Sequence, residues 1–374
     1  MKKDPRSGVA LILVMVSIAF MAIIIVEVIA ASRVDLRIAI NGRNRLQAQY
    51  LAQSSAKLQL LRMYMYKEVA NLKAGNSGIP IDDNMIDKIW NVPMPPIPLP
   101  GVKSTWPGEL SGAISTEGSK IPINLLDGSK YRGSSDDIKA SVKKQIETLI
   151  AGLLETDEFD EKYRGLEPKD LINPLVDWID ADKDLAEGGD EDREYERLDP
   201  GYKTRSDRMP TLSELNMVQG WTDDLILRIA SNFSVMNIDT KVNPNYVSLV
   251  RIKTWGPNLS DSELAHIDQQ RRLKPLSSMT DLENLVTSDP EIRGGDPFNI
   301  PEELKDSKNL SKRERVFKIE ASGIVAGVRR NIRLGVILLE EVTKKATGKP
   351  ESGTRTEKAA KLLDPQVISV EEYL

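Results

Sequence analysis

Residues 9–31 read VALILVMVSIAFMAIIIVEVIAA, and this stretch decides the class of the protein. Its only charged residue is Glu27, near the C-terminal end. At a rise of about 1.5 Å per residue, the stretch forms a helix of roughly 34 Å, which is enough to cross the hydrocarbon core of a bilayer. A cleaved secretory signal has a shorter apolar region that ends at a small-residue cleavage site. The sequence therefore predicts a transmembrane helix that stays in the protein.

The helix is preceded by the short leader MKKDPRSG, which is polar and basic and ends in Gly8. A short basic leader, a glycine and then a long apolar helix resembles a prepilin leader. The resemblance implies cleavage between Gly8 and Val9 by a prepilin peptidase, methylation of the new N-terminus, and retention of the helix in the inner membrane. An ordinary signal anchor is the alternative.

Basic residues flank both ends of the helix, so the positive-inside rule does not fix its orientation. The prepilin resemblance implies a cytoplasmic N-terminus and a periplasmic C-terminal domain, with a single pass through the membrane.

Composition narrows the classes of function. The chain has 374 residues, which suggests two to three units of ordinary domain size. It has no cysteine and one histidine, His266, so disulfides, thiolate chemistry and sulfur-bound zinc are excluded. No nucleophile elbow, phosphate loop or metal-type histidine pair is present, and an enzyme is not expected. A net charge of −5 argues against nucleic acid as the main partner.

Residues 32–74 continue the transmembrane helix as an amphipathic one. Apolar residues recur every seven positions at Leu51, Leu58, Met65 and Leu72, a pattern that suits one helix face packed on a sheet. Asn41-Gly42 is the predicted weak point, where the helix could bend.

The remaining pattern predicts an α+β fold: a pilin-like domain of a helix and an antiparallel sheet, with an all-α domain inserted between its strands. We expect the first pilin-like part at 75–130, the inserted domain at 131–310, closing strands at 311–342 and a flexible tail at 343–374. The helical segments expected by periodicity are 138–156, 168–179, 211–218, 223–233, 243–255, 260–272 and 279–286, and the closing hairpin comprises 316–322 and 329–339.

One position within the transmembrane helix distinguishes this chain from most pilins. The fifth residue after the cleavage point is glutamate in most of them, and here it is Leu13. An unpaired carboxylate in hydrocarbon is costly, so it is kept where a partner amine exists. A subunit without the glutamate cannot pair with a subunit ahead of it, which fits the tip of a filament.

With Leu13 and four further motifs, the chain resembles the K component of type II secretion, a minor pseudopilin. The resemblance implies a subunit at the pseudopilus tip that initiates filament assembly and supports protein export across the outer membrane. It implies the I and J minor pseudopilins and the major pseudopilin as partners. The motifs are GAISTEGSKIPINL (112–125), LVDWIDADKDLAEGGDEDREY (175–195), PTLSELNMVQGW (210–221) and NIDTKVNPNYV (237–247).

Nine carboxylates within residues 177–194 form an acidic loop. So many carboxylates repel one another unless a cation joins them, and calcium takes about six to eight oxygen ligands. The spacing does not match an EF-hand loop, and a solvated loop remains the alternative. The K-component resemblance implies structural Ca²⁺ in this region, with the candidate ligands Asp180, Asp182, Asp184, Asp190, Glu191 and Asp192.

Two other functions remain open. A minor pilin of a type IV pilus would carry the same leader and helix. A membrane-anchored DNA-binding protein is suggested by a helix–Gly220–helix element that resembles a helix-hairpin-helix, although Asp223 and Asp224 at its turn disfavour phosphate.

Overall fold

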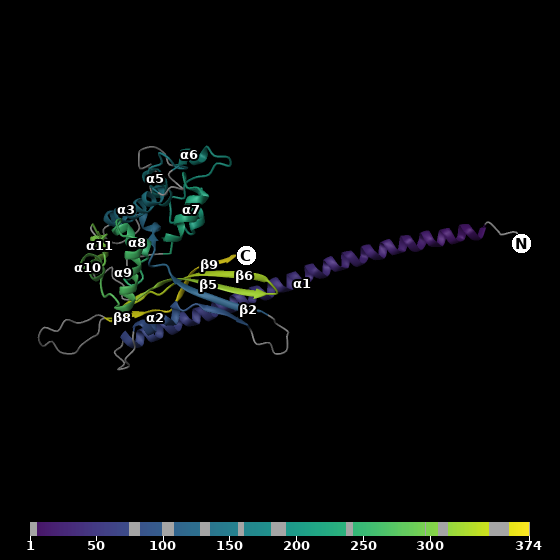
Figure 1. Ribbon diagram of the computed structural model, residues 1–374, viewed down its shortest axis with the longest axis horizontal. Coiled ribbons are helices and arrows are strands. Elements are labelled where there is room, and N and C mark those ends of the chain that lie inside the picture. Colours follow the sequence, from purple (N-terminus) through teal and green to yellow (C-terminus); the bar gives the residue numbers. More distant parts are fainter. Residues whose placement is uncertain are drawn as a thin grey trace.

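The computed structural model describes residues 6–74, 83–98, 108–127, 135–155, 161–180, 192–236, 242–295, 297–305, 313–343 and 359–373. Helix α1, Arg6–Ala74, is 69 residues long, and its N-terminal half projects away from the rest of the molecule (Figure 1). It runs without interruption through Asn41 and Gly42. The glycine costs only about 1 kcal/mol in a helix, too little to break one of this length.

The C-terminal half of α1 packs on an antiparallel sheet of five strands in the order β1-β2-β5-β6-β9. The long central pair, β5 and β6, is joined by a two-residue turn at Ala326 and Gly327, both with positive φ, as a tight hairpin requires. The strands are β1 (Met94–Pro98), β2 (Glu109–Thr116), β5 (Val316–Val325), β6 (Val328–Ile337) and β9 (Gln366–Tyr373).

Small residues let α1 and the sheet approach closely. Ala48 and Ala52 of α1 are fully buried, and they lie against Gly323 of β5. Further along the helix, Tyr66 packs its ring edge-on to Phe317, with the ring centres 5.8 Å apart. The short helix α2, Asp83–Asn91, adds Trp90 to the same core.

The rest of the chain is a helical part at the end of the molecule far from the N-terminus (Figure 1). It contains two separate hydrophobic clusters. The members of the first come from the sequence range 121–233, and the members of the second come from 242–304. The first contains β3 (Ile121–Pro122), η1 (Ile123–Leu126), α3 (Ser135–Leu154), α5 (Pro168–Ile179), α6 (Asp192–Glu196), η3 (Leu212–Met217), α7 (Asp223–Ile229), η4 (Ala230–Asn232) and β4 (Phe233–Ser234).

The second cluster is built by α8 (Leu249–Trp255), α9 (Asp261–Leu273), α10 (Met279–Ser288) and α11 (Glu302–Lys305). Buried Arg251 of α8 connects the two clusters. Its guanidinium donates to Gln145 Oε1 at 2.9 Å and to the Lys120 carbonyl at 3.0 Å. Burial lowers the pKa of Arg251 to about 10.

Three predicted helices differ from the structure. The helix expected over 223–233 ends at Ile229, and Phe233 lies in β4. The segment expected to be helical from residue 243 begins its helix only at Leu249, because the Asn243 side chain accepts a hydrogen bond from the Asn245 amide and forms a local turn. The segment 211–218 is a 3₁₀ helix over Leu212–Met217. The helical core also starts earlier than the expected boundary at 131, since β3 and η1 belong to it.

The expected flexible tail at 343–374 is wrong for its final residues. Strand β8, Ala359–Leu362, pairs with β7, Glu340–Thr343, and β9 pairs with β6 along the main sheet. The charged composition suggested disorder, but β9 pairs with β6, with one register shift between Gly335 and Val336, and β6 lies about 30 residues earlier in the sequence, so the pairing left no local signal.

Candidate functional site

The exposed half of α1 is the first functional feature. All residues from 11 to 40 are exposed, and the large aliphatic side chains among them surround the whole helix. The mean hydropathy of an 18-residue window reaches 3.0, and none of that window is buried. Among the described residues, α1 is the one helix long and apolar enough to cross a membrane.

The predicted processing residues lie at the start of this helix. Gly8 and Val9 fall within α1, although the structure describes no side chains there. Leu13 is 66% exposed, so its apolar side chain faces outward. Its carbonyl accepts a hydrogen bond from the Ser17 hydroxyl at 2.9 Å, within the helix.

Two of the six predicted calcium ligands, Asp180 and Asp192, lie at the two ends of the acidic loop. Asp180 is the C-cap of α5, is nearly buried, and has its Oδ2 3.2 Å from Lys139 Nζ. Asp192 opens α6 and is also nearly buried. Its Oδ1 accepts hydrogen bonds from the Thr204 amide at 3.0 Å and the Thr204 hydroxyl at 2.8 Å.

These hydrogen bonds, the Thr204 hydroxyl first, lower the pKa of Asp192 and keep it charged. Asp182, Asp184, Asp190 and Glu191 lie outside the described residues. The described residues contain no group of three or more carboxylate or imidazole side chains arranged for a metal. Because four predicted ligands are not described, the calcium prediction stays untested.

Aromatic side chains hold the two ends of the acidic loop. Trp178 of α5 contacts Tyr195 of α6 with ring centres 5.5 Å apart, and Tyr195 lies 5.5 Å from Tyr202. The Tyr202 hydroxyl donates to the Met217 carbonyl at 2.9 Å. Trp178 is 2% exposed and belongs to the core of the helical part. The roles of the two tyrosines were missed, because α6 is too short for its periodicity to show a buried face and Tyr202 lies in no helix or strand.

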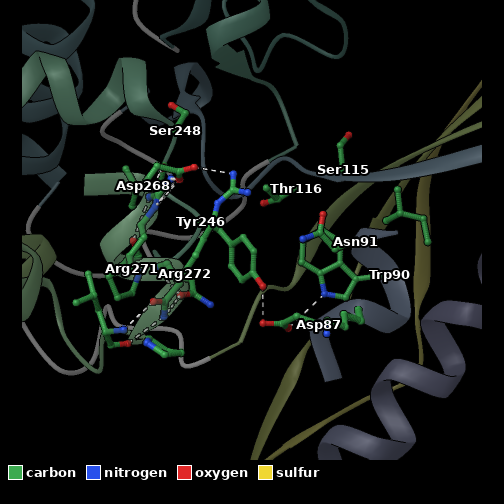
Figure 2. A pocket seen from close by; sticks show the side chains of 18 of the residues that line it. Asp87, Trp90, Asn91, Ser115, Thr116, Tyr246, Ser248, Asp268, Arg271 and Arg272 are labelled. Atoms are coloured by element: carbon green, nitrogen blue, oxygen red, sulfur yellow. Dashed lines mark hydrogen bonds and ion pairs between the residues drawn. The ribbon is translucent and has the colours of Figure 1, made fainter. Parts of the chain in front are cut away.

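A cavity of about 840 Å³ separates the pilin-like sheet from the second helical cluster (Figure 2). At its floor the Tyr246 hydroxyl donates to Asp87 of α2, and the Tyr246 ring lies 5.1 Å from the ring of Trp90. Burial, together with the negative charge of Asp87, raises the pKa of Tyr246, so the hydroxyl stays protonated as the donor.

On the opposite wall Asp268 of α9 accepts hydrogen bonds from Arg271 and is paired with Arg272 at 2.6 Å (Figure 2). Arg271 also donates to the Val247 carbonyl at 2.6 Å. The charged and aromatic groups of this cavity thus bond to one another. The contacts of Tyr246 with Asp87 and Trp90 join the helical part to α2.

Comparison with known proteins supports the resemblance seen in the sequence. Residues 123–237 match the family model described as type II secretion system (T2SS), protein K. A protein named type II secretion system protein K, from Pectobacterium carotovorum subsp. carotovorum, is 28% identical over 134 residues. The match covers 35% of this chain and 38% of that relative, so it spans well under half the length of either.

The fold has a counterpart among solved structures. A chain of the crystal structure of the GspK-GspI-GspJ complex, from the type 2 secretion system of enterotoxigenic Escherichia coli, matches with a TM-score of 0.52 at 15% identity. The match covers 87% of this chain and 99% of that chain. The predicted α+β class, with a long N-terminal helix, is thereby confirmed, as is the resemblance to protein K.

Proposed function

We propose that this chain, whose residues 123–237 match the family model of type II secretion system protein K, is a minor pseudopilin at the tip of the pseudopilus. The observation that carries the proposal is α1 itself. Its exposed apolar half, residues 11–40, continues without a break into the half that packs on the sheet. One helix thus serves as membrane anchor and as filament stem.

In this function the chain assembles and does not catalyse. α1 anchors it in the inner membrane with the N-terminus in the cytoplasm, and the sheet and helical part lie in the periplasm. Leu13 supplies no carboxylate for the amine of another subunit within the membrane, so a subunit carrying it fits the end of a filament. The helical part at the end of the molecule opposite the N-terminus supplies the bulk of a cap (Figure 1).

The proposed partners are the other minor pseudopilins, I and J, and the major pseudopilin. Support comes from the matched solved chain, which was crystallised in a GspK-GspI-GspJ complex. Exposed aliphatic residues surround α1 between 11 and 40, so several neighbouring helices can pack on it in the membrane.

Sequencing the N-terminus of membrane-extracted protein tests the anchor. In cells with prepilin peptidase the mature chain should begin at Val9, and in cells without it at the initiator methionine. Gly8→Ala should retain the leader and abolish export of type II substrates in a strain that lacks the native protein. A mature chain that lacks the whole apolar helix, or normal export by the Gly8→Ala variant, contradicts the proposal.

We further propose that the acidic loop binds structural Ca²⁺. Asp180 and Asp192 bring two nearly buried carboxylates to the ends of the loop, and carboxylate oxygens suit calcium. In a chain without cysteine, the ion would fix a loop that has no disulfide to hold it.

A matched pair of variants tests the calcium site. Asp192→Ala should abolish the stabilisation that added calcium gives to the folded chain. Thr204→Val removes the hydroxyl hydrogen bond to Asp192, keeps the backbone one and removes no carboxylate, so it should lower the melting temperature equally with and without calcium. If the wild type melts at the same temperature in calcium and in chelator, the loop holds no calcium.

A minor pilin of a type IV pilus is the alternative function, and a null mutant that loses twitching but keeps export would favour it. The DNA-binding alternative has weaker support. Gly220 does lie between η3 and α7 with φ of 84°, but Asp224 at the start of α7 accepts hydrogen bonds from Thr222 and Tyr163 at 2.6 Å. A carboxylate in this position repels phosphate.

A further inference from the structure

The cavity between α2 and the second helical cluster has walls that hydrogen bonds fix in place (Figure 2). On one side the Tyr246 hydroxyl donates to Asp87. On the other side the Asn245 side chain donates to the Leu276 carbonyl at 2.9 Å and accepts from the Leu276 amide at 2.7 Å. These contacts fix the shape of a cavity of about 840 Å³. Ligand sites are commonly preformed cavities of this size at the boundary between two domains.

The charged side chains that line the cavity leave one positive charge in excess. Three are basic, Lys88, Arg271 and Arg272, and two are acidic, Asp87 and Asp268. The whole chain, in contrast, has a net charge of −5. The cavity therefore attracts an anionic group, although the chain as a whole repels one.

The two acidic side chains are already engaged by donors of the protein itself. Asp87 accepts a hydrogen bond from Tyr246, and Asp268 pairs with Arg271 and with Arg272, each at 2.6 Å. Arg271 is buried, and its guanidinium also donates to main-chain carbonyls. The acidic groups of the lining thus have protein partners, and the cations that could meet a ligand are the two exposed ones.

Arg272 and Lys88 are these two exposed cations. The Arg272 side chain is 78% exposed, and its contact with Asp268 uses one end of a guanidinium that carries five N–H donors. Lys88 is exposed on α2, and the part of the chain that the structure describes offers its ammonium group no partner. One cation thus comes from the helical part and the other from α2.

The other exposed residues of the lining define the rim of the cavity. Asn91 and Ser277 supply a side-chain amide and a hydroxyl. Pro275 is exposed and Leu276 is half-buried, so an apolar surface lies next to these polar groups. A ligand that matches the rim carries negative charge, further hydrogen-bond acceptors and some aliphatic surface.

We propose that the cavity binds an acidic peptide segment of a partner protein, with its carboxylates at Arg272 and Lys88. The planar guanidinium of arginine matches the two oxygens of a carboxylate. A small anion is a poor occupant, because ion pairs formed in contact with water contribute little free energy. A peptide adds main-chain carbonyls for Asn91 and Ser277 and aliphatic groups that pack on Pro275.

Isothermal titration calorimetry of the full chain in detergent, at about 0.15 M salt, tests the site. The probe is a blocked hexapeptide of alternating glutamate and alanine. Arg272→Gln and Lys88→Gln should each weaken its binding about tenfold, and both residues are exposed, so the fold should persist. The matched control is Lys274→Gln, which removes the same charge from an exposed residue at the end of α9 that does not line the cavity. It should change the affinity less than about twofold.

Carbodiimide coupling locates the bound peptide. The reagent joins a carboxylate to an amine that touches it, so mass spectrometry should find the peptide on Lys88 and not on Lys274. Arg272→Gln should reduce this coupling. If either variant fails to fold, the other one and the coupling of the wild type decide.

Four outcomes would overturn the proposal. They are no binding of the acidic peptide, equal binding of a peptide with glutamine in place of glutamate, equal weakening by Lys274→Gln, and binding of glutarate as tight as that of the peptide. The last result would assign the cavity to a small dicarboxylate. Neither measurement involves export, so each of these outcomes leaves the pseudopilin function standing.

Discussion

The main chain of α1 lies close to Gly323 of β5, and Gly323→Ala tests how α1 packs on the sheet. A Cβ atom at this position would lie 2.2 Å from the Ala48 carbonyl oxygen and 2.5 Å from the Ala52 nitrogen. Both are main-chain atoms of α1, so no side-chain rotation relieves the contact. Because ordinary contact begins near 3.4 Å, the helix must move about 1 Å away from the sheet.

Overpacking of this kind costs about 1–3 kcal/mol, and the rigid main-chain contacts place Gly323→Ala at the upper end. Movement of α1 also loosens buried side chains further along the helix, Ala56 and Met63. A loss of about 3 kcal/mol in the free energy of unfolding lowers the melting temperature by roughly 4 °C for a chain of this size, since the entropy of unfolding is about 2.1 cal/mol/K per residue.

The assay is thermal unfolding of the full chain in detergent, followed by near-ultraviolet circular dichroism. This signal reports the packing of Trp90 against Phe317, whose ring centres are 5.1 Å apart beneath α1. The control is Gly152→Ala in α3, where nothing lies within 4 Å of the added Cβ. It should stabilise the chain by about 0.5–1 kcal/mol through the helix propensity of alanine. A Gly323→Ala variant that melts with the wild type would refute the close approach.

Three further substitutions test side-chain hydrogen bonds within the helical part and between it and α2. Arg251→Met keeps the volume but removes two charge-assisted hydrogen bonds, and denaturant unfolding should show a loss of about 2–4 kcal/mol. Tyr246→Phe leaves Asp87 without its hydroxyl donor, and we expect limited proteolysis between α2 and the helical part to accelerate. Hydrogen bonds from Ser260 and from the backbone of the following loop lower the pKa of Glu263 to about 2, so its contribution is complete above pH 4.5 and is lost as the pH falls toward 2. Melting temperatures of Glu263→Gln and wild type should therefore converge in acid; a constant difference would show that ionisation plays no part.

Local signals predicted much of the helical part. Pro168 and the capping pair Ser260–Glu263 mark two helix starts, and both helices begin within a residue of the expected positions. The candidate calcium ligands were chosen from charge density and from the K-component resemblance, and the two that the structure describes lie at the ends of the loop. How Thr204 and Lys139 engage them could not be foreseen, because these contacts join segments distant in the sequence.

By itself the sequence determined the long apolar helix, its amphipathic continuation and the α+β class with helices between strands, whereas the leader stays a prediction. These properties depend on hydrophobicity and on the spacing of neighbouring residues, which a single chain displays directly. Only the tertiary structure decided that β9 joins the sheet and that Gly323 lies against the backbone of α1. Strand pairing and close approach depend on which distant segments meet. The charged residues around β9 suggested a disordered tail, and its pairing with β6 is visible only in the folded chain.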